Sequence, residues 1–501
     1  MMAAVRVFVA VLVLLMFAGR TGSVHDGPLL LLVSFDGFRY DYLDRSESRV
    51  QLPNFKFLVQ TGVRAKWVHN SFITKTFPNH FTIATGMYEE NHGIVANSMY
   101  DPELGKLFHL NTTDPEWWDV GGEPIWITNQ RHSGGKSGVL NWPGMQVEFN
   151  STLPFRHLPT YNGSIPYHER VDTMVGWFKD SENPINLGVL YFEEPDRTGH
   201  LSGPESEEMD KTLDMVDRTV GYLIDELKAA GLFERMNVII TSDHGMMEVS
   251  QDKVIELDRY LDPSTYLWVD TTPVTAIWPH DEVTREHIYT ALHNAHPKMH
   301  VYYKEDIPAQ YHYRHNRRIM PVIAVADPGW TIVQNASTSR EWNLYKGNHG
   351  YNNSYLPMNP IFVAHGPAFR TNLLSEPFNN VDIYPLMCHI LGLDQHPNNG
   401  SYENVAHLVK KSTSWGPPPS TSEIIVPEGV PAFLCTYKLG VAIGLLLVLG
   451  GCIVGCGIYM QRIERSESIK QAHYTNLGKA HSEEDGDIAD KEPLLEAEGD
   501  V

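Results

Sequence analysis

The sequence predicts an α/β fold in which helices cover both faces of a mostly parallel central sheet. Short, nearly all-apolar runs alternate with helical stretches between about residues 25 and 410. Such runs are typical of buried parallel strands, because both faces of the strand then pack against helices. The chain has 501 residues, of which 42% are hydrophobic and 20% charged, so it can form one large core or two ordinary ones.

Four apolar runs are the predicted strands. They are PLLLLVSF (28–35), INLGVLYF (185–192), MNVIITS (236–242) and NPIFVAH (359–365). An amphipathic helix is predicted over residues 206–231, because its leucines and valines recur at the spacing of one helix face. Gly231 is expected to end that helix.

The N-terminal segment, residues 1–24, has one arginine, then an apolar run, then small residues. This is the pattern of a cleaved secretory signal peptide. An uncleaved membrane anchor is the alternative, but the apolar run is short for a bilayer span. The main folded domain is therefore expected to occupy residues 25–410 and to lie in the lumen or outside the cell.

The C-terminal segments predict a type I single-pass protein of the cell membrane. Residues 411–437 are rich in Pro, Ser and Thr and are predicted to be a stalk. Residues 438–461 are apolar and long enough to cross a bilayer. The acidic tail, residues 462–501, begins with basic residues, which places it in the cytoplasm. Leu494 and Leu495 resemble a dileucine signal read by a sorting adaptor, with cycling through endosomes or lysosomes.

Glycosylation sequons and net charge agree with an extracellular domain that does not bind nucleic acid. The formal net charge of −22 argues against a nucleic-acid-binding surface, although a bound metal could still attract a small anionic substrate. Six Asn-x-Ser/Thr sequons occur in the predicted domain, at Asn111, Asn150, Asn162, Asn335, Asn352 and Asn399.

Acidic residues and histidines follow three of the predicted strands. In open α/β sheets ligands bind beyond the carboxyl ends of the strands, so these residues are expected to meet at one edge. Alone, each has an ordinary explanation in turn chemistry or at the surface. Together they suit zinc, and they exceed what one tetrahedral ion needs, so we expect two ions. They are Asp36, Asp196, His200, Asp243, His244 and His349.

The segment KTFPNHFTIATG, residues 75–86, is a predicted helix with Pro78 in its first turn and Gly86 at its end. Thr76 lies at or beside the N-cap. Its hydroxyl could simply cap the helix, or it could be a nucleophile at the positive end of the helix dipole. Thr74 is the rival nucleophile.

The motifs SFDGFR, KTFPNHFTIATG, EEPDRTGH, TSDHGM and GNHGY resemble those of the ectonucleotide pyrophosphatase/phosphodiesterase family, within the alkaline phosphatase superfamily. The resemblance covers about residues 28–400 and implies an alkaline-phosphatase-like fold with two Zn²⁺ ions. It implies that one ion is held by Asp36, Asp243 and His244, with Thr76 as fourth ligand and nucleophile. The other would be held by Asp196, His200 and His349.

The resemblance also implies a nucleotide-type substrate. Asn97 matches an amide that binds a phosphate oxygen. Phe77 and Tyr161 match an aromatic pair that encloses the base, with Trp142 and Tyr191 nearby. Without the family, core or surface packing would explain these four aromatic residues. The expected reaction forms a nucleotidyl ester on Thr76 and releases a nucleoside 5′-monophosphate.

Several alternatives remain open at this level. A phosphate monoesterase of the same superfamily is a close competitor, although an aromatic pocket suits the organic group of a diester. Choline or lysophospholipid phosphodiester cleavage is the second enzymatic reading. A weakly active cell-surface binding protein is the third. Among nucleotide substrates, NAD or dinucleoside polyphosphates are expected.

Overall fold

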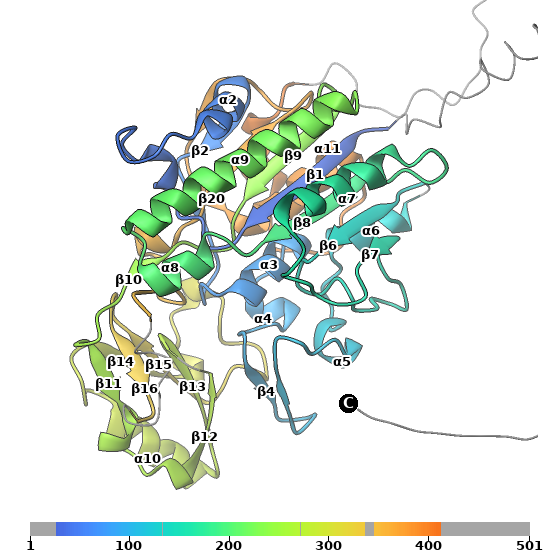
Figure 1. Cartoon of the computed structure of the whole chain (residues 1–501). Coiled ribbons are helices and arrows are strands. Elements are labelled where there is room, and N and C mark those ends of the chain that lie inside the picture. The colour runs from blue at the N-terminus through green and yellow to red at the C-terminus, as the bar shows by residue number, and fades with distance from the viewer. Residues whose placement is uncertain (1–26, 133, 271, 336–344, 412–501) are drawn as a thin grey trace, which may run out of the picture. The chain divides into compact units, whose positions relative to one another are not determined.

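An eight-stranded sheet forms the centre of the molecule (Figure 1). The structure is a computed structural model, and it describes residues 27–132, 134–270, 272–335 and 345–411. Across the sheet the strands are β19 (Leu373–Ser375), β2 (Val63–Ala65), β18 (Phe362–His365), β9 (Met236–Thr241), β1 (Leu29–Phe35), β8 (Leu187–Phe192), β6 (Ser137–Leu140) and β7 (Arg156–His157).

The middle of this sheet is parallel, as predicted. β1 pairs in parallel with both β8 and β9, and β6 pairs in parallel with β8 and β7. The prediction that 359–365 is also a parallel strand is wrong, because β18 runs antiparallel to β9 and β2. An apolar run indicates that a strand is buried on both faces, but it carries no information about direction.

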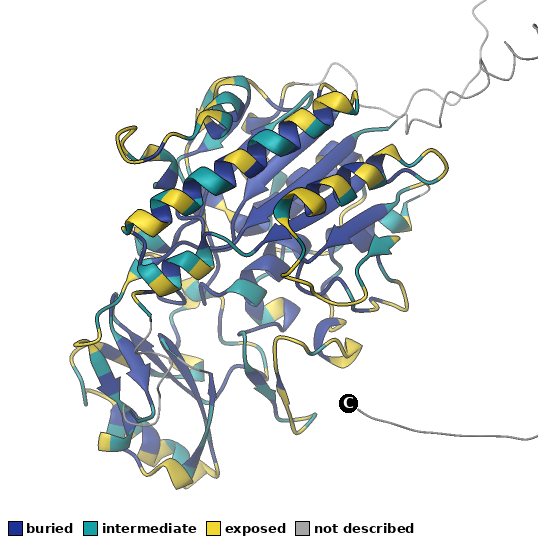
Figure 2. Cartoon of the chain, viewed as in Figure 1, coloured by how far each residue is buried: buried dark blue, intermediate teal, exposed yellow. Residues whose placement is uncertain are grey.

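Helices cover both faces of the sheet, and the alternation along β1 explains how. Leu29, Leu31 and Val33 pack on one face with helices α2 (Pro53–Thr61), α7 (Tyr167–Lys179) and α9 (Glu207–Ala229). Leu30 and Leu32 pack on the other face with α3 (Thr76–Thr85), α6 (Ile125–Arg131) and α11 (Ile383–Leu391). Figure 2 shows the strands buried and the outer faces of α7 and α9 exposed, whereas α3 and α11 on the other face are themselves almost entirely buried. This layering is the predicted α/β architecture.

Helix α9 is the predicted amphipathic helix, with slightly different ends. The Ser206 side chain is the N-cap and accepts a hydrogen bond from the Met209 N–H at 3.1 Å. The helix ends at Ala229, and Gly231 lies just beyond it with a φ of 68°, in the left-handed region.

A second sheet, which the sequence did not predict, packs around its own hydrophobic core. Its strands, all antiparallel to their neighbours, are β12 (Tyr266–Asp270), β13 (Val274–Pro279), β15 (Val322–Ala326) and β14 (Met299–Tyr303), with helix α10 (Glu282–Leu292) against them.

Short elements make the remaining connections. They are β3 (Val68–His69), α4 (Glu89–His92), β4 (Met99–Asp101), β5 (Lys106–Phe108), α5 (Pro115–Trp118), α8 (Asp196–Ser202), β10 (Met247–Glu248), β11 (Val254–Glu256), β16 (Thr331–Val333), β17 (Gly347–Asn348), β20 (Phe378–Asn379) and α12 (Tyr402–Val405).

The described residues all belong to one compact unit, Met1–Trp415. The predicted signal peptide (1–24), most of the stalk (411–437), the predicted membrane span (438–461) and the acidic tail (462–501) lie outside the described residues. Among the residues that are described, no helix combines the length and the apolar character needed to cross a bilayer.

Candidate active site

Three strands of the central sheet deliver acidic residues to one edge. Asp36 directly follows β1, Asp243 follows β9 by two residues, and Asp196 begins helix α8 shortly after β8. The Asp196 N–H donates to the Asp36 carbonyl at 2.9 Å, so a backbone hydrogen bond links the segments that follow β1 and β8. The expected meeting of these carboxylates at the carboxyl edge of the sheet is what the structure shows.

Gly37 makes this approach possible. Its φ is 67°, and a Cβ at this position would lie 2.8 Å from the Cα of Asp196. Its N–H donates to Asp243 Oδ1 at 3.1 Å, and the Ser242 hydroxyl donates to the same oxygen at 3.0 Å. Only a glycine allows the backbone to turn this tightly between two carboxylates.

Thr76 is the first residue of α3, and its hydroxyl lies beside this cluster. Thr76 Oγ1 is 3.3 Å from His244 Nε2. The N-cap is Lys75, without a side-chain capping bond, so the expectation that the Thr76 hydroxyl caps the helix is wrong. The Asn97 side chain takes part of that role, because its Oδ1 accepts from the Phe77 N–H at 3.0 Å.

Thr74, the rival nucleophile, is buried and engaged elsewhere. Its hydroxyl donates to the Tyr351 carbonyl at 2.9 Å and accepts from the Gly350 N–H at 2.9 Å. Both of its hydrogen-bonding roles are therefore used in holding backbone. Of the two threonines, only Thr76 has a hydroxyl beside the acidic cluster.

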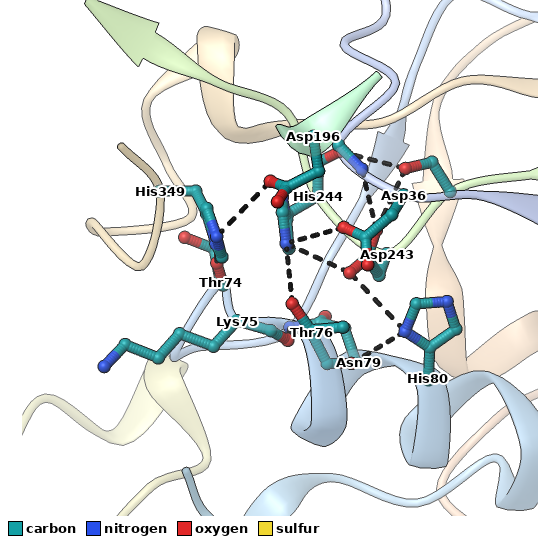
Figure 3. A network of polar contacts seen from close by, with 12 residues as sticks. Asp36, Thr74, Lys75, Thr76, Asn79, His80, Asp196, Asp243, His244 and His349 are labelled. Atoms are coloured by element: carbon teal, nitrogen blue, oxygen red, sulfur yellow. Dashed lines mark hydrogen bonds and ion pairs between the residues drawn. The ribbon is translucent and has the colours of Figure 1, made fainter. Parts of the chain in front are cut away.

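The first predicted ligand set comes together around His244 (Figure 3). His244 Nε2 is 3.3 Å from Asp36 Oδ1 and 3.0 Å from Asp243 Oδ2. Burial opposes protonation of His244, but the Asp243 carboxylate outweighs it and raises the pKa of the imidazole.

The second predicted ligand set comes together around Asp196. Its two carboxylate oxygens lie 3.4 Å from His200 Nε2 and 3.5 Å from His349 Nε2. One turn of α8 presents Asp196 and His200 on the same side, as their spacing predicted. The two Nε2 atoms are 3.1 Å apart. The imidazole rings of His244 and His349 are stacked with centroids 3.4 Å apart, so the two sets adjoin.

The hydrogen bonds of the three histidines determine which ring nitrogen is free. His244 Nδ1 donates to the Gly245 carbonyl, His200 Nδ1 to the Gly347 carbonyl and His349 Nδ1 to the Thr74 carbonyl, each at 2.9 Å. A carbonyl oxygen can only accept, so in the neutral ring each Nε2 carries a lone pair. These lone pairs face each other and the carboxylates, which is unfavourable without a cation between them.

The carboxylates show the same deficiency of positive charge. Asp36 Oδ1, Asp196 Oδ1 and Asp243 Oδ2 are buried and have no hydrogen-bond partner. Within the described ranges their ion-pair partners are histidines only. Burial, together with the nearby Asp243 and Asp196 carboxylates, raises the pKa of Asp36 well above its usual range. The second predicted set, Asp196, His200 and His349, is close enough together to hold one metal ion. The residues of the first set fall into two overlapping groups that could each hold an ion, namely Asp36 and Asp243 with His80, and Asp36 and His244 with Asp196. Carboxylate with imidazole suits zinc.

His80 is a neighbour of the cluster that the sequence analysis did not single out. It comes one turn after Thr76 on α3, and its Nδ1 donates to the Thr76 carbonyl at 2.8 Å. Its Nε2 is 2.9 Å from Ser34 Oγ, which can donate to it. Both ring nitrogens are thus engaged, and burial lowers the pKa of the imidazole. His80 therefore lies beside Asp243 as a neutral imidazole that packs against the cluster. Its i, i+4 spacing from Thr76 is the sequence pattern that could have identified it.

A cavity of about 700 Å³ opens beside the cluster. Its volume is in the range of small-molecule sites. Thr76, Asp36 and Asp196 line its floor, and no lysine or arginine is among the described residues that line it. All five predicted substrate-pocket residues line the same cavity, namely Phe77, Asn97, Trp142, Tyr161 and Tyr191.

These five residues differ in how they are held. The Tyr191 hydroxyl donates to Asp36 Oδ2 at 2.6 Å, so this side chain supports a predicted metal ligand. Trp142 is buried, with its ring against His80. Tyr161 is 50% exposed. Phe77 packs against Phe108 and Trp118 on one side and borders the cavity on the other.

Sequence reasoning missed other parts of the cavity wall. Trp118 lies on Phe77 with ring centroids 5.8 Å apart. Asn141, just beyond β6, has a φ of 61° and exchanges two hydrogen bonds with the backbone of Asn162. This pair fixes the loop that carries Tyr161. The position of this loop depends on the contact between Asn141 and Asn162, which are 21 residues apart, and no local sequence pattern indicates such a contact.

Comparisons with known proteins agree with this geometry. The chain matches the family model "Type I phosphodiesterase / nucleotide pyrophosphatase" over residues 30–352. Human ectonucleotide pyrophosphatase/phosphodiesterase family member 5 is 46% identical over 433 residues, which are 85% of this chain and 88% of that protein. Bovine bis(5′-adenosyl)-triphosphatase ENPP4 is 46% identical over 446 residues, 87% of this chain and 92% of that protein.

A solved structure has a similar fold and a similar level of sequence identity. It is murine ectonucleotide pyrophosphatase/phosphodiesterase 5 in an inactive threonine-to-alanine form, in complex with AMP. The TM-score is 0.73 at 48% identity, covering 76% of this chain and 100% of that one. From its sequence and its site, this chain belongs to the type I phosphodiesterase/nucleotide pyrophosphatase family and is a hydrolase of phosphodiester and pyrophosphate bonds.

Proposed function

We propose that the protein hydrolyses a small nucleotide at a phosphodiester or phosphoanhydride bond and releases a nucleoside 5′-monophosphate through an ester on Thr76. The observation that carries this proposal is the position of the Thr76 hydroxyl. It lies where the Asp/His cluster meets the floor of an aromatic-lined cavity. A nucleophile, a site for cations and a site for an organic group thus share one space.

Phosphate binding at this position depends on cations that the protein's own side chains do not supply. The floor carries Asp36 and Asp196, and the lining residues include no lysine or arginine in the described chain. Asp36, Asp243, His244 and Thr76 would hold one Zn²⁺ ion, and Asp196, His200 and His349 the other. Bound there, the ions would offset the charge of the phosphoryl oxygens and favour ionisation of the threonine hydroxyl and of water.

Asn97 supports the orientation of the phosphoryl group. Its Oδ1 is occupied by the Phe77 N–H, which leaves the amide Nδ2 to donate into the cavity. A donor held by the start of a helix and aimed at a non-bridging oxygen stabilises charge without reorganising. Asn97 would thus serve both the helix and the substrate.

Phe77 and Tyr161 are the proposed walls for the base. Both line the cavity, and Phe77 is held from behind by aromatic packing. Tyr161 is half exposed, which suits a side chain that is covered when a planar ligand binds.

The proposed reaction proceeds in two steps. In the first, the Thr76 Oγ–P bond forms in line as the bond from phosphorus to the leaving oxygen breaks. The hydroxyl proton passes to solvent and the leaving oxygen takes one up. In the second, water attacks the phosphorus, the Thr76 ester breaks and the hydroxyl is restored. One water is consumed, and the nucleoside 5′-monophosphate leaves.

Relatives support the substrate class. One murine relative was solved with AMP, and a threonine-to-alanine form of it is described as inactive. Another relative is named a bis(5′-adenosyl)-triphosphatase. We therefore propose dinucleoside polyphosphates and NAD as substrates. We also propose a type I membrane protein with an extracellular catalytic domain, which depends on segments outside the described residues.

The test compares the full-length chain with Thr76→Ala and Thr74→Ser. Diadenosine triphosphate, NAD, ATP and glycerophosphocholine are offered in turn. Thr76→Ala is expected to lower kcat by at least about a thousandfold while AMP still binds, since the nucleophile is lost but the three other proposed ligands of that ion remain. Thr74→Ser keeps the buried hydroxyl and should retain activity within a few fold.

The covalent step is tested by rapid acid quenching. With labelled diadenosine triphosphate, one adenylyl group is expected on the peptide that contains Thr76. Cleavage of glycerophosphocholine without cleavage of nucleotides would overturn the proposal. So would full activity in Thr76→Ala.

A further inference from the structure

One predicted glycosylation sequon forms part of the cavity wall. Leu110, Asn111, Thr112 and Thr113 all line the cavity beside the active site. They belong to the turn between β5 and α5. Leu110 is 57% exposed and Asn111 is exposed, so this part of the wall is its outer rim. The cavity therefore extends from the Asp/His cluster at the floor to a complete Asn-Thr-Thr sequon at the mouth.

The turn that carries this sequon is fixed to the pocket. The Thr112 N–H donates to the His109 carbonyl at 2.9 Å, and the His109 N–H donates to Thr112 Oγ1 at 3.0 Å. The Trp118 indole N–H donates to the Thr112 carbonyl at 2.9 Å. Trp118 also lines the cavity and packs on Phe77. A group attached to this turn is consequently held at the mouth.

Asn111 is also chemically available. Its side chain makes no hydrogen bond within the described part of the chain, whereas the amide groups of two other sequons are engaged. Asn352 Nδ2 donates to the Tyr311 hydroxyl at 2.7 Å, and Asn335 Nδ2 donates to Asp258 Oδ2 at 2.9 Å. A glycan on the side-chain nitrogen of Asn111 therefore displaces no hydrogen bond of the described chain.

We infer that Asn111 carries an N-linked glycan at the exposed rim of the active-site cavity, where it limits how large a substrate can be. A glycan is bulky and hydrophilic, and one attached to this turn crowds the part of the opening beside Trp118 and Phe77. The nucleotidyl group fits inside, between Thr76 and the aromatic walls. A polymeric substrate must extend past the glycan, so small substrates are accepted and polymeric ones are hindered. This inference depends on the proposed function and on entry into the secretory pathway.

The test uses the full-length chain from a mammalian cell line and two substrates with the same scissile bond. One is diadenosine triphosphate. The other is a short RNA whose 5′ end carries an adenosine through the same triphosphate bridge. Asn111→Gln and Thr113→Ala remove the sequon, and Thr113→Ser retains it. Ser401→Ala, which removes the sequon at Asn399, is a control because Asn399 does not line the cavity.

Glycopeptide mass spectrometry is expected to find a glycan at Asn111 in the parent chain and in Thr113→Ser. Loss of the glycan should raise the ratio of kcat/KM for the RNA to that for diadenosine triphosphate on the order of tenfold. Enzymatic trimming to a single sugar should shift the ratio the same way with every side chain intact. Thr113→Ser and Ser401→Ala should keep the parent ratio.

Two outcomes would overturn the inference, namely an unmodified Asn111 and a ratio that does not change when the glycan is lost. A chain that cleaves neither substrate in any glycoform would overturn the proposed function, and the gating role with it. That result is recognised by the absent rate on diadenosine triphosphate.

Discussion

Buried carboxylates at two places in this protein differ in whether arginine side chains neutralise them. Asp101, at the end of β4, is fully buried and receives hydrogen bonds from Arg317 Nε at 2.9 Å and Arg318 Nε at 2.8 Å. Arg318 is itself buried and also donates to backbone carbonyls. At the active site, Asp36 and Asp243 are just as buried and accept hydrogen bonds from neutral donors, but within the described chain their ion-pair partners are histidines and no lysine or arginine.

The pKa values of Asp101 and Asp36 follow this difference, whereas at Asp243 the nearby His244 and His80 outweigh burial and lower the pKa. Burial alone would raise the pKa of Asp101, but hydrogen bonds from Arg317 and Arg318 lower it to about 2. Burial and the nearby carboxylates raise the pKa of Asp36 well above its usual range. A buried acid is therefore not by itself a sign of a functional site. The sign is a group of buried acids that the protein's own cations do not neutralise, because such a group needs a metal ion.

Metal removal should give the largest effect, since it affects only one of the two groups. Treatment with a chelator is expected to lower kcat/KM for diadenosine triphosphate by at least about a thousandfold and to lower Tm. Readdition of Zn²⁺ should restore both. The cluster around Asp101 needs no ion, so far-UV circular dichroism should keep its native form below the new Tm. Undiminished activity in protein that mass spectrometry shows to be metal-free would contradict the assignment.

Removing the Asp101 carboxylate should mainly lower the stability of the fold. Asp101→Ala leaves the buried Arg318 guanidinium without its carboxylate and is expected to lower the free energy of unfolding by about 3 kcal/mol. Urea unfolding of the metal-loaded protein measures this change. Asp101→Asn, which keeps the shape and one acceptor, should cost less.

The contacts of Asp101 with Arg317 and Arg318 also predict that the free energy of unfolding falls at acidic pH. Because the pKa of Asp101 is lowered in the folded state, its contribution is present above the unfolded-state value near 4 and is lost as the pH falls toward about 2. Asp101→Ala should flatten this part of the stability profile. An unchanged slope would show that the arginines do not stabilise the folded state through Asp101.

Replacing a predicted metal ligand should stabilise the metal-free protein, whereas Asp101→Ala should destabilise it. Asp36→Asn removes one negative charge from among Asp36, Asp196 and Asp243, and its amide oxygen can still accept from Tyr191. We expect the free energy of unfolding of the metal-free chain to rise by about 1–2 kcal/mol, while activity with metal is lost. Differential scanning calorimetry with and without Zn²⁺ measures both states. Destabilisation of the metal-free chain would indicate that the carboxylate is already neutralised.

Glu89 is a buried acid that belongs to neither of these two places. Both of its carboxylate oxygens are buried without a partner, and burial raises its pKa well above the usual value of 4.5. The folded protein then keeps a proton that the unfolded chain releases, so the free energy of unfolding falls as the pH rises above about 4.5. Glu89→Gln should remove this dependence and stabilise the protein by about 1 kcal/mol at pH near 8. Equal Tm differences between mutant and parent at pH near 5 and near 8 would contradict this expectation.

Much of the fold and the ligand positions could be predicted from the sequence. The apolar runs of β1, β8 and β9 identify buried strands, and Asp36, Asp196 and Asp243 follow them within a few residues. Parallel strands end at the same edge, so these residues had to meet. The direction of β18 and the whole second sheet were missed, because short apolar runs do not encode partners or direction.

The sequence by itself determined that Asp36, Asp196, His200 and Asp243 meet, because strand ends and the i, i+4 spacing of Asp196 and His200 are local properties of the chain. Only the tertiary structure decided which nitrogen of His200 and His349 is free, because backbone carbonyls from distant segments accept from Nδ1 of these two rings. It also decided that Thr76 contacts His244 and does not cap its helix. Finally, it placed the Asn111 sequon at the mouth of the cavity, an arrangement that depends on Trp118 holding the turn in place.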